Sequence, residues 1–353
     1  MNTINLNSVE RNFKKTLLAL FLLGVNFIFS QNYRNEKSYI EDFGKNELYV
    51  KESLAEYTKS VVNSNSVDRT DRTLTTIYNK LENINTVLLK TDKGLKGDLT
   101  LRDAFINLNA KTLELFKNKT LMLNDYKAMS EKSLDEIDAI LKKKENDILG
   151  YYHEVSNFEK TKREFGMKYG VKIRSFLKKN ILEYNAMENF VFYKISVIDE
   201  KYIKLINENN AEEATLCLNY LKLECDNALK AIEEYNDDIA DTSLNTTNKN
   251  FIEFMKNNNS ILHMYFIQYD KLYQDIQKAK NNPSISDEEY NEKVRNYNAV
   301  KNIYFTQYKA VQFKKQQMVN KFYVTNSTFL KNNVQFENNY ARYTDVDWYS
   351  NFL

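Results

Sequence analysis

Cysteine can form disulfides or bind metals, and this chain contains two cysteines, Cys217 and Cys225. They lie eight residues apart in the stretch TLCLNYLKLECDNAL. In a helix that spacing places their Cα atoms about 12 Å apart, whereas a disulfide needs about 4.4–6.8 Å. Both fall near the face of Leu218, Leu221 and Ala228, which predicts buried free thiols. A metal pair or an intermolecular bridge is the alternative interpretation.

The histidines and the known catalytic motifs give no sign of enzyme chemistry. There are two histidines, His153 and His263, and neither has a Glu three residues before it, as di-metal bundles require. The sequence has no zinc-type Cys and His spacing, no P-loop, no G-x-G-x-x-G and no G-x-S-x-G. Its acidic residues are scattered, mostly beside lysines, as on solvated helix faces. We expect a protein that is not an enzyme, with no catalytic, cofactor-binding or metal-ligating residues and with surface or flank histidines.

Residues 1–30 have the layout of a secretory signal peptide. A basic segment precedes an apolar run of about a dozen residues, shorter than the roughly 20 that a membrane-spanning helix needs. Ser30 is a small residue at a suitable position −1, so we expect cleavage after Ser30 or after Gln31. A short membrane anchor or a buried helix is the alternative. No later apolar run approaches membrane length, so the mature chain should have no transmembrane segment.

The charge of the mature chain argues against nucleic acid as a partner. The whole sequence has 50 Lys and Arg against 48 Asp and Glu, and residues 1–30 contain three of the basic and one of the acidic residues. Their removal leaves a net charge of zero. Nucleic-acid-binding proteins usually show a basic excess or a basic patch, and we find no sustained basic stripe.

The elements that would hold these residues are long amphipathic helices, and they repeat. The chain has one Pro and seven Gly, so few residues interrupt a helix. One apolar face recurs every seven residues, at Leu101, Leu108, Leu115, Met122 and Met129. An offset of 150 residues gives a matching set at Phe251, Asn258, Tyr265, Leu272 and Ala279. The sequence therefore predicts an internal duplication.

Two matched capping boxes support the duplication. Ser133 with Glu136, and Ser286 with Glu289, both fit the S-x-x-E pattern at the start of a helix. We expect Asp98 and Thr247 to cap the N-termini of the helices that begin at these residues. Each unit should contain four helices. Their expected ranges are 36–64, 70–92, 99–130 and 133–170, then 178–209, 211–238, 247–280 and 286–324.

The predicted fold is all-α, with two tandem antiparallel repeats that resemble four-helix bundles, an elongated shape and no β-sheet. The predicted organisation is a signal peptide (1–30), a first repeat (33–173), a second repeat (176–325) and an aromatic C-terminal tail (326–353). Gly166 and Gly170, between the repeats, allow a kink or a break, although one continuous helix could also join them.

The aromatic residues allow two interpretations. Four of them lie near the C-terminus, at Tyr343, Trp348, Tyr349 and Phe352. They either dock back on a bundle or form a patch for a partner, since Trp and Tyr are enriched at interfaces. The Tyr and Phe residues on the helix faces either fill the core or line a pocket for a lipid, a haem or another apolar ligand.

The tandem pattern also resembles a known group of proteins. SYIEDFGKNELYVKESL and EYNAMENFVFYKISVID open the two units, and YYHEVSNFEKTKREFGMKYGV closes the first. These segments resemble an uncharacterised family of helical surface proteins, often lipoproteins, of Bacteroidota and spirochaetes. The signal peptide ending in FSQ is similar to those of secreted Bacteroidota proteins. The resemblance implies a helical envelope protein without known catalytic residues, but this chain has no Cys after the cleavage site for lipid attachment.

Together these observations favour a secreted, non-enzymatic helical protein of the periplasm or cell surface of a Gram-negative bacterium. Its partner would be another protein or a component of the cell envelope. The alternative is a carrier or sensor that binds a small apolar ligand inside a helical bundle.

Overall fold

The computed structural model of the chain describes residues 35–63, 67–118, 120–121, 123–173, 180–235, 239–282 and 284–333. Within these ranges the regular structure is helical, with isolated bridge pairs such as Leu95 with Asp98 and no sheet. The all-α class is therefore confirmed. Outside the described ranges lie the predicted signal peptide, with Ser30 and Gln31, and the aromatic tail residues Tyr343, Trp348, Tyr349 and Phe352.

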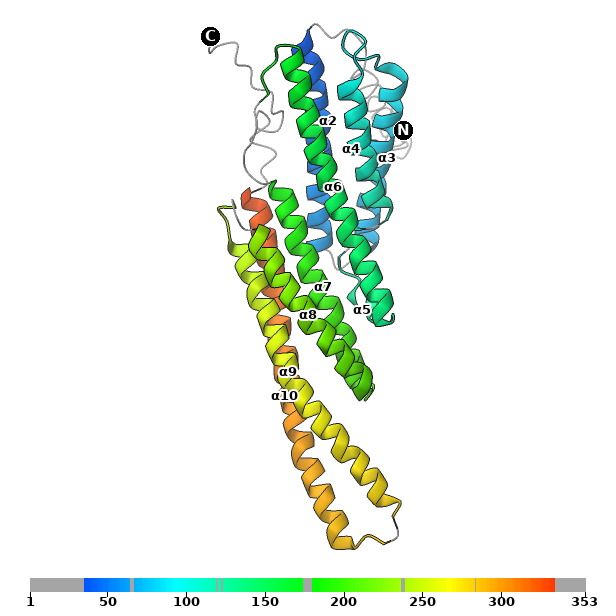
Figure 1. Ribbon diagram of the computed structural model, residues 1–353, viewed down its shortest axis with the longest axis vertical. Helices are drawn as coiled ribbons and strands as arrows, with labels where there is room; N and C mark the ends of the chain where they lie inside the picture. Colours follow the sequence, from blue (N-terminus) through cyan, green and yellow to red (C-terminus); the bar gives the residue numbers. More distant parts are fainter. Residues whose placement is uncertain are drawn as a thin grey trace, which may run out of the picture.

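Nine helices are described, and their labels follow Figure 1. They are α2 (Glu36–Asn63), α3 (Val67–Thr91), α4 (Thr100–Lys117), α5 (Tyr126–Ser130), α6 (Leu134–Lys168), α7 (Ile181–Asn207), α8 (Ala211–Tyr235), α9 (Ser243–Lys280) and α10 (Asp287–Asn333).

The first half of the chain forms a bundle of four antiparallel helices, α2, α3, α4 and α6 (Figure 1). α4 packs against α2, α3 and α6. Buried aromatic residues meet in its centre, where the Phe105 ring lies 5.6 Å from the Phe43 ring and 5.7 Å from the Phe158 ring. Burial of these rings supplies the apolar contacts that hold the four helices together.

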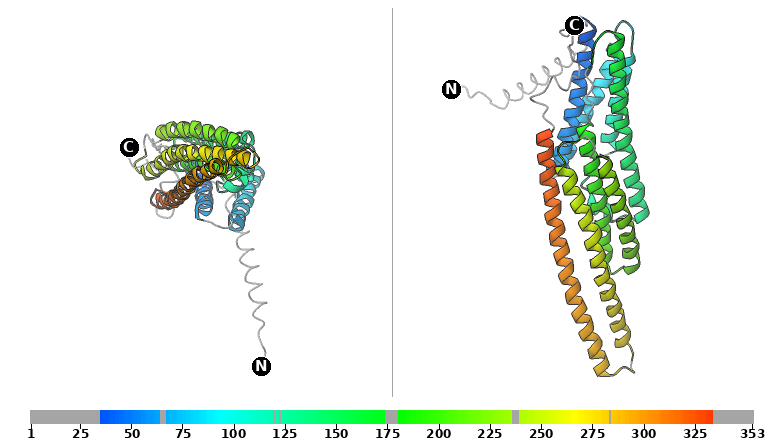
Figure 2. Two further views of the ribbon diagram at one scale, coloured as in Figure 1. Left: turned by 90° about the horizontal axis from the view of Figure 1, so that it is seen from below. Right: turned by 60° about the vertical axis from the view of Figure 1, so that its left-hand side comes forward.

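The second half forms a second bundle from α7, α8, α9 and α10, displaced along the long axis of the molecule (Figures 1 and 2). α9 has 38 residues and α10 has 47, whereas α7 has 27 and α8 has 25. The longer pair therefore extends past the α7–α8 turn. Residues 264–307 form the extension, a two-helix arm. It lies beyond the contacts that join Thr215 to His263 and Asn207 to Tyr308.

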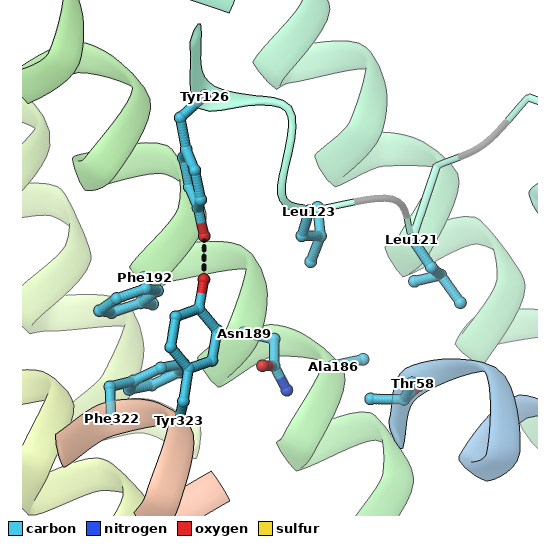
Figure 3. Close-up of a pocket in the computed structure, with 9 residues that line it drawn as sticks. All are labelled: Thr58, Leu121, Leu123, Tyr126, Ala186, Asn189, Phe192, Phe322 and Tyr323. Atoms are coloured by element: carbon cyan, nitrogen blue, oxygen red, sulfur yellow. Dashed lines mark hydrogen bonds between the residues drawn. The ribbon is translucent and has the colours of Figure 1, made fainter. Parts of the chain in front are cut away.

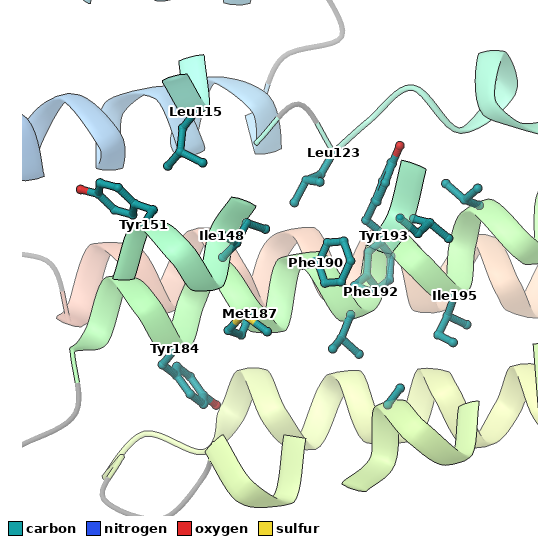
Figure 4. Packing of buried hydrophobic residues seen from close by; sticks show 14 of the residues in the cluster. Leu115, Leu123, Ile148, Tyr151, Tyr184, Met187, Phe190, Phe192, Tyr193 and Ile195 are labelled. Carbon is teal, nitrogen blue, oxygen red and sulfur yellow. The ribbon is translucent and has the colours of Figure 1, made fainter. Parts of the chain in front are cut away.

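One continuous core joins the two bundles, and α7 lies at its centre (Figure 4). α7 packs against α5, α6, α8, α9 and α10. Its buried residues lie on all sides of the helix, including Phe190, Val191, Phe192 and Tyr193 in succession. A helix that is apolar all round has to be surrounded by other helices. The two halves therefore share their interior over the length in which they overlap.

A backbone break separates the halves, so no continuous helix joins them. α6 ends at Lys168, and the Val171 N–H donates to the Gly166 carbonyl oxygen at 2.8 Å. Gly170 has a φ of +70°, a left-handed conformation that favours glycine. A Cβ atom on Gly166 would lie 2.6 Å from the Ile173 side chain, so the chain folds back closely there. α7 then starts at Ile181.

The predicted helix over 99–130 is wrong at its C-terminal end. α4 ends at Lys117, and α5 is a separate short helix from Tyr126 to Ser130. The chain turns aside because its side chains pack on α7: the Tyr126 and Tyr193 rings lie 5.4 Å apart, and the Tyr193 hydroxyl donates to the Asp125 carboxylate. The heptad position Met122 lies outside the described residues. The corresponding helix of the second half, α9, is unbroken.

The capping predictions have different outcomes. At Ser133 both bonds of the capping box are present, as predicted. At Ser286 the Glu289 N–H donates to the Ser286 hydroxyl at 3.2 Å, while the Glu289 carboxylate lies 3.6 Å from Lys293. Thr247 is not a cap, because α9 begins earlier, at Ser243.

Asp98 and Asp241 bond to the first turns of their helices. Asp98 accepts the Thr100 N–H at 3.0 Å, as expected of a residue at the start of α4. Asp241 accepts the Ser243 N–H at 3.1 Å at the start of α9. These carboxylates satisfy backbone donors that would otherwise have no partner.

α10 continues past the predicted end at 324, so residues 326–333 of the predicted tail are helical. Leu330 is buried beside Ala55 of α2, with Ile181 and Leu182 of α7 packed against the pair. These contacts explain why the helix extends. None of the described helices contains an apolar stretch long enough to cross a membrane.

Candidate functional site

The two cysteines are buried free thiols on α8, as predicted. The Cys217 thiol lies 3.5 Å from the Ile198 carbonyl oxygen, to which it donates. Burial raises the pKa of Cys217 and of Cys225 to about 12. Both sulfurs therefore remain protonated at neutral pH, and a protonated thiol is a poor nucleophile and a poor metal ligand.

The histidines lie apart, on α6 and α9. His153 is exposed, and His263 is half-buried against the Tyr202 and Phe266 rings. The His263 Nε2 atom lies 3.1 Å from the Thr215 hydroxyl, and burial lowers the pKa of the imidazole. Within the described ranges no three His, Cys, Asp or Glu side chains are grouped as metal ligands would be.

Two cavities in the described part of the molecule are small. The one in Figure 3, between the bundles, has a volume of about 30 Å³, and the Tyr126 and Tyr323 hydroxyls form a hydrogen bond of 2.9 Å at its wall. A second cavity, beside Glu47 and Tyr151, has about 10 Å³. A water molecule needs about 10–15 Å³, and sites for drug-sized ligands have roughly 300–1,000 Å³. These cavities have room for a water molecule or two.

Aromatic rings occupy the space where an apolar ligand would bind. The Phe192 ring stacks on the Phe322 ring with centroids 3.7 Å apart and an interplanar angle of 1°. The Phe251 ring lies 4.5 Å from Phe192 on the other side. Stacked rings at these distances are in van der Waals contact. Phe192, Phe251 and Phe322 therefore form core.

A buried polar layer lies in the second bundle, and sequence reasoning missed it. Glu188 of α7 is 1% exposed. Its carboxylate accepts from the Asn245 amide at 3.0 Å and from the Asn248 amide at 2.7 Å, both on α9. Among the described residues no Lys, Arg or His lies within 4 Å of this carboxylate. Burial raises its pKa to about 7, although the amide hydrogen bonds act in the opposite direction.

The same layer continues across to α10 through asparagine side chains. Asn326 donates to Asn189 at 2.5 Å and accepts from Asn185 at 2.7 Å. All three amides are buried. Buried amides have to be paired, because each unpaired donor costs about 1–3 kcal/mol. The layer therefore fixes the relative positions of α7, α9 and α10.

Ionic contacts in both bundles act in the same way. In the first bundle the Lys162 ammonium lies 2.6 Å from Glu47 and 3.1 Å from Glu159. Lys162 is fully buried. In the second bundle Lys315 of α10 lies 2.6 Å from Asp199 of α7. The Lys162–Glu47 pair joins α6 to α2 and the Lys315–Asp199 pair joins α10 to α7, whereas Lys162 and Glu159 both belong to α6. Of these residues, Glu47 lines one of the cavities described above.

The outer surface of the second bundle shows a separation of charge. α8 contains six Asp and Glu against two Lys. α10, from Lys293 to its end at Asn333, contains eight Lys and Arg and no Asp or Glu. α8 packs against α7 and α9, whereas α10 packs against α9, α7 and α2, so the two lie on opposite sides of α9 (Figure 2, left). The zero net charge of the mature chain concealed this separation.

Large apolar side chains are exposed on the same two helices. On α8, Leu216 is 58% exposed and Leu223 is 57% exposed. On α10, Phe313 and Val324 are each 68% exposed, and Phe305 is 41% exposed. Exposed apolar residues grouped on one face are typical of protein–protein contacts. These outer faces of α8 and α10, together with the arm, are the candidate functional surface.

No protein-family model, no curated protein and no solved structure matches the chain. The resemblance to helical surface proteins of the cell envelope therefore stays a prediction.

Proposed function

We propose that this chain is an exported, non-enzymatic helical protein of the periplasm or cell surface of a Gram-negative bacterium. It acts by binding another protein or a component of the cell envelope. The signal-peptide pattern of residues 1–30 supports export, and a resemblance to envelope surface proteins points in the same direction.

The observation that supports a binding role most strongly is the contrast between the interior and the surface. The interior is filled with stacked rings and paired amides, while bulky apolar residues such as Phe313 and Val324 face solvent. Burying one such side chain in an interface gains about 1.5–3 kcal/mol. A carrier needs the opposite arrangement, with its apolar space inside.

The arm provides a second apolar surface. Tyr269 stacks on Tyr297 at 5.6 Å and on Tyr304 at 5.1 Å, which holds the two helices of the arm together. Met264 of α9 is 57% exposed and Ile303 of α10 is 46% exposed. Among the described helices, α9 and α10 alone form the arm and none of the others covers these residues, so a partner would have access to them.

Solvent extraction tests the proposal against the carrier alternative. Protein purified from its own cells is denatured in organic solvent, and the extract is examined by mass spectrometry. We expect no stoichiometric small molecule from the wild type. The variant Phe192→Ala serves as a positive control, because it opens a ring-sized cavity next to the one in Figure 3 and should retain added benzene. A stoichiometric apolar compound in the wild-type extract would overturn the proposal.

A further inference from the structure

The outer faces of α8 and α10 have the same arrangement of residues with opposite charge. On α8, Glu212 and Glu213 precede the exposed Leu216 by four and three residues. Residues at these spacings are neighbours on one face of a helix. On α10, Lys309 precedes the exposed Phe313 by four residues. Leu216 thus lies beside negative charges on α8, and Phe313 lies beside a positive charge on α10.

The second apolar residue of α10 repeats the pattern. Lys321 precedes Val324 by three residues, and Lys314 is adjacent to Phe313. All three lysines, Lys309, Lys314 and Lys321, are exposed. Within the described part of the chain none of them has a carboxylate within 4 Å. Their charges are therefore free to meet acidic groups on another molecule.

We propose that the acidic, leucine-bearing face of α8 binds the basic, apolar face of α10 on a second copy of this chain. This inference rests on the proposed binding function and names the partner. A second copy supplies both faces at once, each complementary to the other in charge and each with exposed apolar residues. An anionic membrane or polymer would match α10 alone and would leave the α8 face unexplained.

The spacing of the apolar residues fits this pairing. Leu216 and Leu223 are seven residues apart, which is about 10 Å along a helix. Phe313 and Val324 are eleven residues apart, which is about 16 Å. The two leucines can therefore lie between the two α10 residues, where the exposed side chains of Gln317 and Asn320 are smaller and polar.

The contact joins different faces of the two copies, so it is a head-to-tail interface. Such an interface leaves an unused α8 face at one end and an unused α10 face at the other. Association then continues into a ring if the rotation closes, or into a filament if it does not. An elongated, exported helical protein with this property would build a ring or a fibre at the cell envelope.

The test is sedimentation velocity of the full chain without its signal peptide, at low and high ionic strength. We expect oligomers at low ionic strength that dissociate when salt screens the charges. An α10 variant, Lys314→Glu with Lys321→Glu, should associate at least about tenfold more weakly. A control with the same change in net charge, Lys127→Glu on α5 with Lys160→Glu on α6, should associate like the wild type.

Charge exchange gives the most specific result. An α8 variant, Glu212→Lys with Glu213→Lys, should also lose self-association, whereas a mixture of the α8 and α10 variants should assemble. Far-UV circular dichroism of each variant establishes that it is folded. A wild type that stays monomeric at low ionic strength overturns the inference, as does a mixture that fails to assemble.

A failure of self-association can be distinguished from a failure of the proposed binding function. A monomeric wild type with a clean solvent extract removes self-association and leaves binding to another partner in place. Binding of the basic face to anionic lipid vesicles by a monomeric wild type would assign α10 to a membrane instead. A stoichiometric ligand in the extract would overturn the binding function itself.

Discussion

Replacing Glu188 with glutamine removes a carboxylate from the core of the second bundle while keeping the size of the side chain. Glu188 is 1% exposed and is held by the amides of Asn245 and Asn248, without a cation among its described neighbours. The Asn248 side-chain oxygen has no hydrogen-bond partner within the described structure. The Asn248 Nδ2 atom now faces Glu188, so a half-turn of this amide would bring its oxygen into place to accept a hydrogen bond from glutamine.

The size of the effect follows from the difference between the pKa of Glu188 in the folded protein and its pKa in the unfolded chain. The pKa of Glu188 is about 7 in the fold, against 4.5 for an ordinary glutamate. Between these pH values the folded protein holds a proton that the unfolded chain releases. The free energy of unfolding therefore falls as the pH rises through this window, and it levels off above pH 7. At about 1.4 kcal/mol per pH unit, the loss is about 3 kcal/mol.

Urea unfolding at a series of pH values from 4.5 to 8 measures this loss. Relative to the wild type, Glu188→Gln should gain about 3 kcal/mol of stability between the two ends of the series. Glu253→Gln, an exposed substitution on α9, should follow the wild-type curve at every pH. If the difference between Glu188→Gln and the wild type is the same at pH 4.5 and at pH 8, the carboxylate does not titrate in this window and the reasoning fails.

Other consequences are open to direct measurement. Lys162→Met should lower the free energy of unfolding by about 3–5 kcal/mol, because it removes the fully buried cation of Glu47 and leaves only Lys51, at 2.5 Å, to pair with that carboxylate; Lys162→Met with Glu47→Leu should recover most of the loss. The two buried thiols of α8 should react with a thiol reagent only after unfolding, because burial raises the pKa of each to about 12; rapid labelling of the native protein would contradict their burial. The secreted protein should begin at Gln31 or Asn32 when its peptides are mapped, and an N-terminus that retains the initiator methionine would refute the signal peptide.

The fold class and the positions of most helices could be predicted, because the spacing of apolar residues in an amphipathic helix shows which of its faces is buried. Leu101, Leu108 and Leu115 recur every seven residues and are all buried. The helices have the same order in both halves, as the predicted duplication requires, and the duplication itself stays a prediction. The break after Lys117 could not be predicted from the pattern, because contacts of Tyr126 with α7 in the other half of the chain determine it.

The end of α10 was predicted too early for a related reason. Asn326 looks like the start of a polar tail, yet it is fully buried and bonds to Asn185 and Asn189. Glu188 was missed in the same way, because a pattern of apolar residues does not reveal which polar residues share a layer with them. Buried polar residues that pair across helices become visible only once the helices are placed side by side.

The net charge of the whole chain does not predict how charge is distributed over its surface. From the sequence we expected a mature chain of zero net charge without a sustained basic stripe, whereas the acidic residues of α8 and the basic residues of α10 lie on opposite sides of α9. A count over each predicted helix would have found the acid-free stretch from 293 to 333 in the sequence alone.

Native mass spectrometry of the protein isolated from its own cell envelope is the most direct test of the central claim. The account predicts masses that are whole-number multiples of the mature polypeptide, alone or with a bound macromolecular partner, and no constant small addition. A fixed extra mass of small-molecule size on every polypeptide would contradict a filled interior and an outward-facing binding role.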